Sequence, residues 1–566
     1  MAFVANDNQQ LTLTDSTLNL TQREKRVLEK SWAKTFSEKV FPAIDERIFS
    51  VLYSDKASRP NTPVNVIVGA LILKEALGDT DDELVEALMF DVRYQYALHT
   101  TSFEEQPLSD RTLSRFRARV LAYETEHDVD LIHECIVKMA KEIAEFMNIS
   151  PNMQRMDSLM VAANIKNLSL LELFYTCVAN LAKIMTQREI ALPDEQYHYI
   201  EKDDYNRCIY HKRELDATER TIVVMHDAEK LIELCDKTGD LDDTSEYQLL
   251  IRLLKERTII DGDGTRRLRK KEEVENPSEV LLNPSDPEAT FRYKAGGKNL
   301  GYVGNVVESV GEKGSLITDY AYEKNIYADN QFMKDYLERQ DTFDDGAFIV
   351  ADGAYSGETN SQIAASHNLK LVTTNFTGRK PDEIYADFKF SDDGHFLLEC
   401  INGCTPSECI YDSGNDRSVA YFKTEECSSC PYKDRCQPRF LKTRIRKEVS
   451  WKAVGRAKQL QYMKTEEFSQ YARFRNGVEA IPSLLRRRYH VDKIPTRGKN
   501  RTRFHFGFKI AALDFQKLLD YINNPPEGMT PKDIRHMSDE ELLDIDYFLN
   551  EDLDDIFEEG EGFFIF

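Results

Sequence analysis

The stretch Phe348-Ile349-Val350-Ala351-Asp352-Gly353 decides the fold of this 566-residue chain. Four consecutive apolar residues followed by Asp-Gly predict a short buried strand that ends in a turn. Residues 356–367 have the pattern of a helix, and Leu369–Thr374 predict a second strand. A strand, a helix and a strand at this spacing form a parallel pair with a right-handed crossover, which indicates an α/β fold.

Two aspartates lie in or directly after predicted apolar strands, where a charged carboxylate is unusual. Asp352 follows an apolar strand, and ligands of open α/β sheets bind beyond the carboxyl ends of strands. The alternative is that Asp-Gly simply makes a turn. Asp157 lies within the predicted strand Gln154–Ala163, where an unpaired carboxylate is costly. It either faces water on an edge strand or takes part in a site.

Glu479 is the third candidate carboxylate. On a helix, Arg475 lies one turn before it and Arg486 two turns after it, so the three side chains share a face. A surface ion pair that contributes little is the alternative interpretation. Pro482 would either kink this helix or mark the start of a new one.

Regions outside this core divide the chain further. Residues 1–37 are interpreted as a polar lead-in, and 38–150 as an all-helical domain. In that domain, Thr62-Pro63 begins a helix that runs to Leu77, Thr80 and Glu83 form a capping box, and Ser109 opens a helix. Residues 186–290 are charged and mostly helical, which indicates an insertion, and β-strands return in Tyr293–Val307 and Ser315–Tyr322.

The charge of the chain is unevenly distributed. Its net charge of −24 argues against a nucleic-acid partner, but Arg439–Lys517 holds 21 Lys or Arg against 6 Asp or Glu. Asp539–Glu561 holds 12 acidic residues and no Lys or Arg. A basic block followed by an acidic tail, here residues 523–566, often accompanies nucleic-acid binding.

Six of the ten cysteines fall between Cys400 and Cys436, which favours a metal site over disulfides. The Cys-x2-Cys pair suits tetrahedral Zn²⁺. The predicted ligands are Cys427, Cys430 and Cys436 with one of the three earlier cysteines, for which we take Cys409. Reduced cysteines in a small Cys-rich insertion, at about 395–440, are the alternative.

Together these motifs resemble the DDE transposases of bacterial insertion sequences. The resemblance rests on Asp157 in a strand, on Asp352 in Ala-Asp-Gly-Ala-Tyr, and on Glu479 in Arg-x3-Glu-x6-Arg. The region 41–120 is similar to the helical N-terminal domain of that family. The resemblance implies a ribonuclease H-like mixed α/β sheet over 151–522, interrupted by the helical and Cys-rich insertions.

The resemblance also implies an activity. Asp157, Asp352 and Glu479 would bind two Mg²⁺ (or Mn²⁺) ions, which relieve the repulsion between three carboxylates and assist phosphoryl displacement. The reaction would cleave DNA at the ends of the protein's own element and transfer the strand to a target. The expected partners are double-stranded DNA, carrying the terminal inverted repeats or the target, and a second copy in a homodimer. A catalytically inactive, transposase-derived DNA-binding protein is the alternative, and a zinc-binding regulator is a third.

Arginines are the expected DNA contacts. One group surrounds Glu479, where the DNA backbone must lie. A second group recurs every four residues on a predicted helix, as a recognition helix or a solvated face. The full set is Arg475, Arg486, Arg487, Arg488, Arg501, Arg503, Arg111, Arg115 and Arg119. The longest mostly apolar run, Val64–Leu73, is too short to span a bilayer, and no secretory signal is expected, so we expect a cytoplasmic protein that associates with the nucleoid.

The acidic tail generates the first prediction. If it competes with DNA for the basic block, truncation after about Pro531 should tighten non-specific DNA binding, most strongly at low salt where screening is weakest. Its interspersed Leu, Ile and Phe residues also allow a helix that packs on the body. Binding isotherms over a salt series distinguish the two, because a truncated protein with unchanged DNA affinity and lower stability would identify a packing element.

Overall fold

The structure is a computed structural model, and it describes residues 1–6, 15–54, 56, 58–211, 215–294, 296–376 and 380–523. The chain divides into two compact units. Unit 1 comprises Met1–Ser150, Ser158–Ala328 and Ile481–Phe566, and unit 2 comprises Pro151–Asp157 and Asp329–Ala480. The acidic tail from residue 524 onward lies outside the described residues, so the expectation for it stays a prediction.

The N-terminal part of unit 1 is helical. Its helices are α1 (Gln22–Glu29), α2 (Trp32–Thr35), α3 (Val64–Leu77), α4 (Asp81–Phe90), α5 (Val92–Ala97), α6 (Asp110–His127) and α7 (Leu131–Phe146). The interpretation of residues 1–37 as a polar lead-in is wrong for its second half. Thr21 and Glu24 form a capping box for α1, and Ala33 and Phe36 are fully buried. The few apolar residues there are spaced so that one helical face packs inward.

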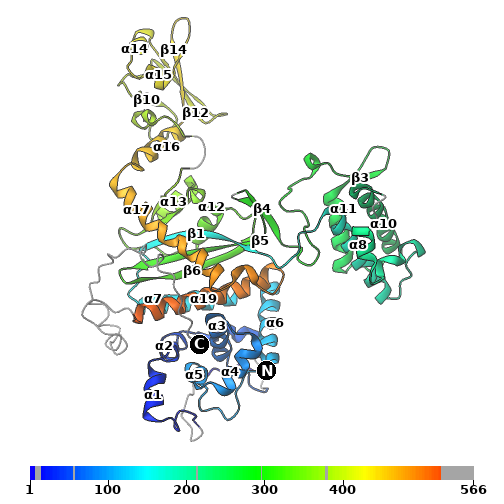
Figure 1. The fold of residues 1–566 in the computed structure, drawn as a ribbon. Coiled ribbons are helices and arrows are strands. Elements are labelled where there is room, and N and C mark those ends of the chain that lie inside the picture. The colour runs from blue at the N-terminus through cyan, green and yellow to red at the C-terminus, as the bar shows by residue number, and fades with distance from the viewer. Residues whose placement is uncertain are drawn as a thin grey trace. The chain divides into compact units, whose positions relative to one another are not determined.

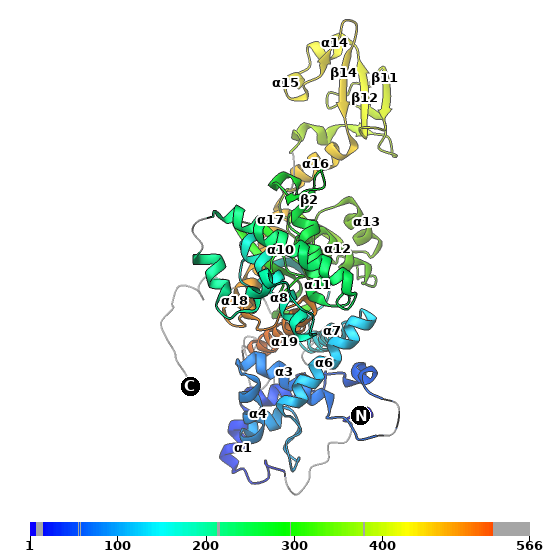
Figure 2. The same ribbon diagram turned by 90° about the vertical axis from the view of Figure 1, so that its right-hand side faces the viewer.

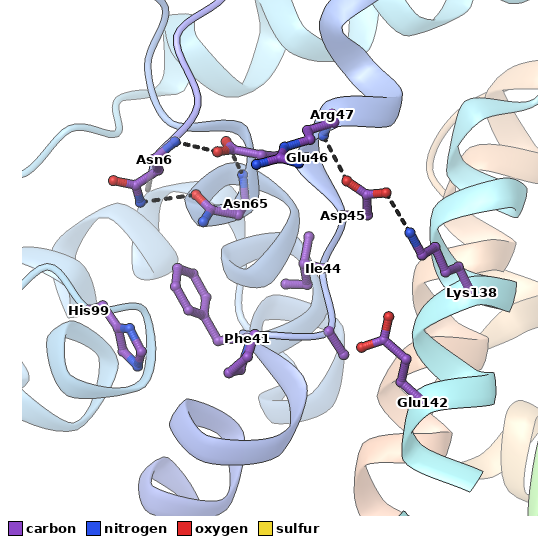
Figure 3. A pocket seen from close by; sticks show the side chains of 12 residues that line it. Asn6, Phe41, Ile44, Asp45, Glu46, Arg47, Asn65, His99, Lys138 and Glu142 are labelled. Atoms are coloured by element: carbon purple, nitrogen blue, oxygen red, sulfur yellow. Dashed lines mark hydrogen bonds and ion pairs between the residues drawn. The ribbon is translucent and has the colours of Figure 1, made fainter. Parts of the chain in front are cut away.

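The helix starts in this region agree with those predicted from the sequence, with one difference. The capping box of Thr80 with Glu83 and the Ser109 cap are both confirmed. Pro63, however, is the N-cap of α3 and gives it no side-chain cap. Glu46 takes over that role, since its Oε2 accepts from the Val64 and Asn65 amides at 3.1 and 3.4 Å. Figure 3 shows Glu46 directed at Asn6 and Asn65.

The predicted insertion in unit 1 is a helical bundle with its own hydrophobic core (Figure 2). Its main elements are α8 (Leu170–Gln187), α10 (Ala217–Thr238), α11 (Ser245–Arg257) and the hairpin of β2 (Thr258–Ile260) with β3 (Arg266–Leu268). Ser169 caps α8 in a capping box with Glu172. The helical prediction for this region is therefore confirmed.

The strands form a mixed sheet. They are β1 (Met153–Ala162), β4 (Thr290–Lys294), β5 (Gly297–Gly311), β6 (Gly314–Lys324), β7 (Phe348–Ala351) and β8 (Lys370–Thr373). The strand order is β4-β5-β1-β7-β8, with β6 also paired to β5. Pairs β4–β5 and β5–β6 are antiparallel, and β1–β7 and β7–β8 are parallel. Strand β1 contributes its first half to unit 2 and its second half to unit 1.

A glycine allows the second half of β1 to approach β5. Gly301 has φ +137°, and a Cβ there would lie 2.4 Å from the Val161 carbonyl oxygen. Beside it, the Ala163 amide donates to the Leu300 carbonyl at 3.0 Å. A side chain at residue 301 would separate the two backbones, so this position requires glycine.

Unit 2 adds helices and a Cys-rich region to β7 and β8. Its helices include α12 (Asp329–Glu338), α13 (Glu358–Ser366), α14 (Thr424–Ser428), α15 (Lys433–Cys436), α16 (Trp451–Tyr462) and α17 (Glu466–Asn476). The predicted strand–helix–strand unit is confirmed as β7, α13 and β8. The Cys-rich region contains β9 (Lys389–Phe390) paired with β10 (Leu397–Glu399), and a sheet of β11 (Glu408–Asp412), β12 (Arg417–Phe422), β14 (Ile445–Val449) and β13 (Arg439–Phe440).

The long helix α19 (Lys499–Asn523) is the centre of unit 1, with β6 on one side and α3 on the other (Figure 1). Lys509 of α19 is 7% exposed, and its Nζ lies 2.6 Å from Oε2 of Glu75 on α3. Burial alone would raise the pKa of Glu75, but His505, Lys509 and Lys74 outweigh it and lower the pKa to about 2. The pair therefore holds α19 against α3.

We predict that Glu75→Gln lowers the free energy of unfolding by about 3–5 kcal/mol at neutral pH, because Lys509 is left buried without its partner. The folded pKa of about 2 lies below the ordinary value of 4.5, so this stabilisation is complete above pH 4.5 and is lost as pH falls toward 2. Denaturant titrations across this range should show the gap between wild type and variant closing. Exposed Glu86 on α4 is the control, and an effect of Glu86→Gln as large as that of Glu75→Gln would contradict the account.

Candidate active site

Strand pairing brings the two aspartates together. The parallel register of β1 with β7 pairs Met153 with Phe348 and Arg155 with Val350. Asp157 and Asp352 each lie two residues further along, so they are level with one another on adjacent strands. Adjacent strands are about 4.8 Å apart, and side chains at paired positions point to the same face. The two carboxylates are therefore neighbours.

Helix α17 packs on that face of the sheet. The Phe348 ring lies 4.9 Å from the Tyr471 ring and 5.4 Å from the Phe474 ring, measured between centroids. From β1, Arg155 Nη1 donates to the Phe474 carbonyl at 2.9 Å. Because side chains alternate along a strand, Asp157 and Asp352 lie on the same face as Arg155 and Phe348.

Glu479 reaches the site from the end of α17. The helix ends at Asn476, and a 3-10 turn, η8 (Gly477–Glu479), follows. Pro482 lies in the first turn of the next helix, α18 (Ala480–Arg487), where its missing N–H costs little. Pro482 thus marks a helix start, one of the two outcomes that the sequence allowed.

Arg475 joins two of the three carboxylates. Its Nη1 lies 2.8 Å from Glu479 Oε1, and its Nη2 lies 3.6 Å from Asp157 Oδ2. Arg475 is 9% exposed, whereas the Glu479 side chain is 60% exposed. Both contacts engage the Arg475 guanidinium within the chain, so the structure does not favour the predicted contact of Arg475 with DNA.

Asp352 also forms the Asp-Gly turn that was the alternative explanation for an aspartate at this position. It is the N-cap of η6 (Gly353–Tyr355), and its Oδ1 accepts from the Ala354 amide at 3.4 Å. An ionised carboxylate has about four acceptor positions, so one such bond leaves capacity for a cation. The two interpretations of Asp352 are therefore compatible.

The site consists of carboxylate oxygens, the donors that Mg²⁺ and Mn²⁺ prefer. The strand register sets Asp157 level with Asp352, and Arg475 joins Asp157 to Glu479. Arg475 already supplies positive charge to two of them. The residues present thus fit a divalent cation, and they can bind a phosphate ester through it.

The other predicted DNA contacts fall into different environments. Arg503 is half-buried, and this desolvation lowers its pKa. It pairs with Glu124 on α6 and, at 3.1 Å, with Asp130 at the start of α7, so the structure does not favour its predicted contact with DNA. Arg486 binds Asp492 at 3.1 Å and the Met160 carbonyl at 3.0 Å. The exposed members of the set are Arg111, Arg115, Arg486, Arg487, Arg488 and Arg501, while Arg119 is half-buried with its guanidinium over the Tyr53 ring.

The cysteines gather differently from the prediction. Cys400, Cys404, Cys427, Cys430 and Cys436 line one small pocket. Cys409 lies on β11 instead, with its Sγ 2.9 Å from Ser418 Oγ. Cys409 packs on the same small core as Cys427 and Cys436 but does not line that pocket, and its role as a ligand stays a prediction.

Two functional residues were missed from sequence alone. Arg155 holds the α17 backbone, and Gly477 lets that backbone come close, since a Cβ on Gly477 would lie 1.8 Å from Arg155 Nη1. Arg155 offered a weak signal as a charged residue two positions before Asp157 in a strand. Gly477 offered none, because its contact lies more than 300 residues away in sequence.

Comparison with known families identifies two stretches of the chain. Residues 25–119 match a transposase domain (DUF772), and residues 400–519 match a transposase DDE domain. These matches define a nucleic-acid-processing enzyme of the transposase class. Together the two matches indicate a DDE transposase of an insertion element, and that family generally uses divalent metal ions and acts on DNA.

The DDE match includes Glu479 and the cysteines but neither Asp157 nor Asp352. Those two aspartates join the site through the strand register alone. No curated protein and no solved structure matches the chain. In the described part of the chain, none of the helices has the length and apolarity needed to cross a membrane.

We predict that Gly477→Ala lowers the free energy of unfolding by about 1–3 kcal/mol, because the added methyl group displaces the Arg155 guanidinium from its place at α17. Gly455 on α16 is the matched control, since a Cβ there meets nothing within 4 Å. Gly455→Ala should be neutral or stabilising by up to about 1 kcal/mol. Equal destabilisation by the two substitutions in denaturant titrations would contradict this role for Gly477.

Proposed function

We propose that this transposase cleaves DNA at the ends of its own element and transfers the exposed strand to target DNA, with Asp157, Asp352 and Glu479 as its catalytic residues. The observation that carries the proposal is the convergence of these three carboxylates. Register brings Asp157 beside Asp352, and Arg475 joins Asp157 to Glu479. The strand order, with β1 between β5 and its parallel neighbour β7, supports a ribonuclease H-like core.

Two Mg²⁺ (or Mn²⁺) ions are the proposed cofactors. Asp157, Asp352 and Glu479 would hold them. When bound, such ions supply Lewis acidity and orient the attacking and leaving oxygens of an in-line phosphoryl displacement. The chain itself contributes the rigid spacing of the ligands, because β1 and β7 are hydrogen-bonded strands.

Arg475 is proposed as a positioning residue. Its guanidinium offsets the repulsion between Asp157 and Glu479 and keeps both carboxylates directed at one point. Arg475 Nε has no hydrogen-bond partner within the described part of the chain. A side chain held only by carboxylates can shift when their charge is satisfied in another way.

The proposed DNA contacts are arginines within the two matched regions. Arg487, Arg488 and Arg501 are exposed and would bind the phosphate backbone, while the exposed Arg111 and Arg115 and the half-buried Arg119 would present a basic face of α6. In this proposal, residues 38–150 form the DNA-binding domain and 151–522 the catalytic domain. The terminal inverted repeats and the target would be bound by a homodimer.

We predict that Asp157→Asn, Asp352→Asn and Glu479→Gln each reduce strand cleavage by at least about a thousandfold, equivalent to about 4 kcal/mol of lost transition-state stabilisation. The substrate is a duplex carrying the repeats that bracket the reading frame. Binding of that duplex should persist in each variant, because the substitutions keep shape and remove negative charge.

Glu466→Gln is the matched control for Glu479→Gln. Glu466 lies at the start of α17, the helix that precedes Glu479; its side chain is 75% exposed and pairs only with Arg473 among the described residues. Cleavage by this variant should equal that of the wild type. Near-normal cleavage by any of the three site variants would remove that residue from the proposed catalytic set.

A further inference from the structure

A histidine, an aspartate and a cysteine meet inside the helical bundle of unit 1. His198 lies on the short helix η3 (Asp194–Ile200), and Asp204 follows it in the chain. Cys208 lies one turn after Asp204, on η4 (Arg207–His211). The imidazole nitrogen, the carboxylate oxygen and the sulfur that face one another all lie within 4.8 Å. These side chains share no residue with the proposed catalytic set.

Asp204 is the centre of this cluster. Its Oδ2 atom lies 2.7 Å from the Tyr175 hydroxyl and 2.7 Å from His198 Nδ1. Cys208 Sγ lies 3.5 Å from the same oxygen. Asp204 is 4% exposed and Cys208 is 8% exposed, so water has little access to the carboxylate. A carboxylate oxygen has two lone pairs, so three neighbouring donors compete for Oδ2.

The backbone at Cys208 has an unusual conformation. The helix η4 has the wide turn of a π-helix, which is rare and is found mostly at functional sites. Arg220 of α10 stabilises this turn, because its Nη1 donates to the Cys208 and Ile209 carbonyls at 3.0 and 2.8 Å. The position of the Cys208 sulfur therefore depends on α10 as well as on its own segment.

We propose that His198, Asp204 and Cys208 bind one Zn²⁺ ion. Zinc binds nitrogen, oxygen and thiolate sulfur together, whereas Mg²⁺ and Ca²⁺ take oxygen ligands. Around a tetrahedral zinc ion, a carboxylate oxygen lies about 3.5 Å from a thiolate sulfur and about 3.3 Å from an imidazole nitrogen. The first distance matches that between Asp204 and Cys208. The second requires the His198 ring to move outward by about half an ångström.

A bound ion would also end the competition at Asp204. His198 and Cys208 would become ligands of the metal, and the Tyr175 hydroxyl would donate to the ligating carboxylate. Such outer hydrogen bonds orient the ligands of zinc sites. Arg207 lies 3.4 Å from the other oxygen, Oδ1, and leaves Oδ2 to the ion. Because the His198 side chain is 32% exposed, water can reach the fourth position.

The ion would fasten the segment that joins α8 to α10. This segment contacts α8 through Tyr175 and α10 through Arg220. Its own elements, η3 and η4, are single short turns, which are marginal without tertiary contacts. Zinc binding is thus expected to stabilise residues 194–211 more than the long helices around them.

Zinc content of full-length variants tests the proposal. After chelator treatment and reloading with Zn²⁺ under reducing conditions, Cys208→Ser and His198→Gln should each hold about one zinc per chain less than the wild type. The difference between variants reports on this site alone, because neither substitution alters the Cys-rich region. Equal zinc content in the wild type and in both variants would overturn the proposal.

Cys177→Ser is the matched control. Cys177 lies on α8 in the same hydrophobic core, is 2% exposed, and is outside the cluster. This variant should keep all of the zinc. If Cys177→Ser loses as much zinc as Cys208→Ser, zinc content follows the packing of the core, and the assignment of these ligands is overturned.

Hydrogen exchange of the wild-type chain covers the case in which the variants do not fold. Adding Zn²⁺ to chelator-treated protein should slow exchange of the backbone amides in residues 194–211. At free zinc about ten times the dissociation constant, the expected slowing is about tenfold. Unchanged exchange of this segment in excess zinc would overturn the proposal.

Discussion

Parallel hydrogen bonding between β1 and β7 is the constraint on which the rest of the site depends. It brings two aspartates separated by almost 200 residues of sequence to the same level of the sheet. A slip of one residue would turn one of them to the opposite face. The intervening chain, including a helical bundle with its own core, can be long because loop-closure entropy grows only slowly with length.

Carboxylates that lie close together repel each other, and the positive charge of Arg475 offsets part of this repulsion. The guanidinium reaches Asp157 on the sheet and Glu479 after α17, so one cation sets the distance between helix and strand. Arg155 and Gly477 hold the backbone of α17 at the position this requires.

Much of the fold could be predicted because its signals are local. Apolar runs marked β1, β7 and β8, and capping residues such as Ser109 and Ser169 marked helix starts. The differences from prediction concern partners that lie far away in sequence. From sequence, Arg503 and Arg475 were expected to bind DNA phosphates. In the structure Arg503 forms an ion pair with Glu124, and Arg475 forms one with Asp157. Cysteine spacing could not show that Cys409 lies outside the pocket that the other five cysteines line, because this depends on the direction of β11.

The central claim is that Asp157, Asp352 and Glu479 bind divalent cations at one site, and iron-directed backbone cleavage tests it most directly. Fe²⁺ can replace Mg²⁺ at carboxylate sites, and with ascorbate it generates radicals that cut the chain beside its ligands. The account predicts cuts near residues 157, 352 and 479. Excess Mg²⁺ should suppress all three cuts, and Asp352→Asn should weaken all three at once. Cuts absent from these three positions, or unchanged by Mg²⁺ and by the substitution, would contradict it.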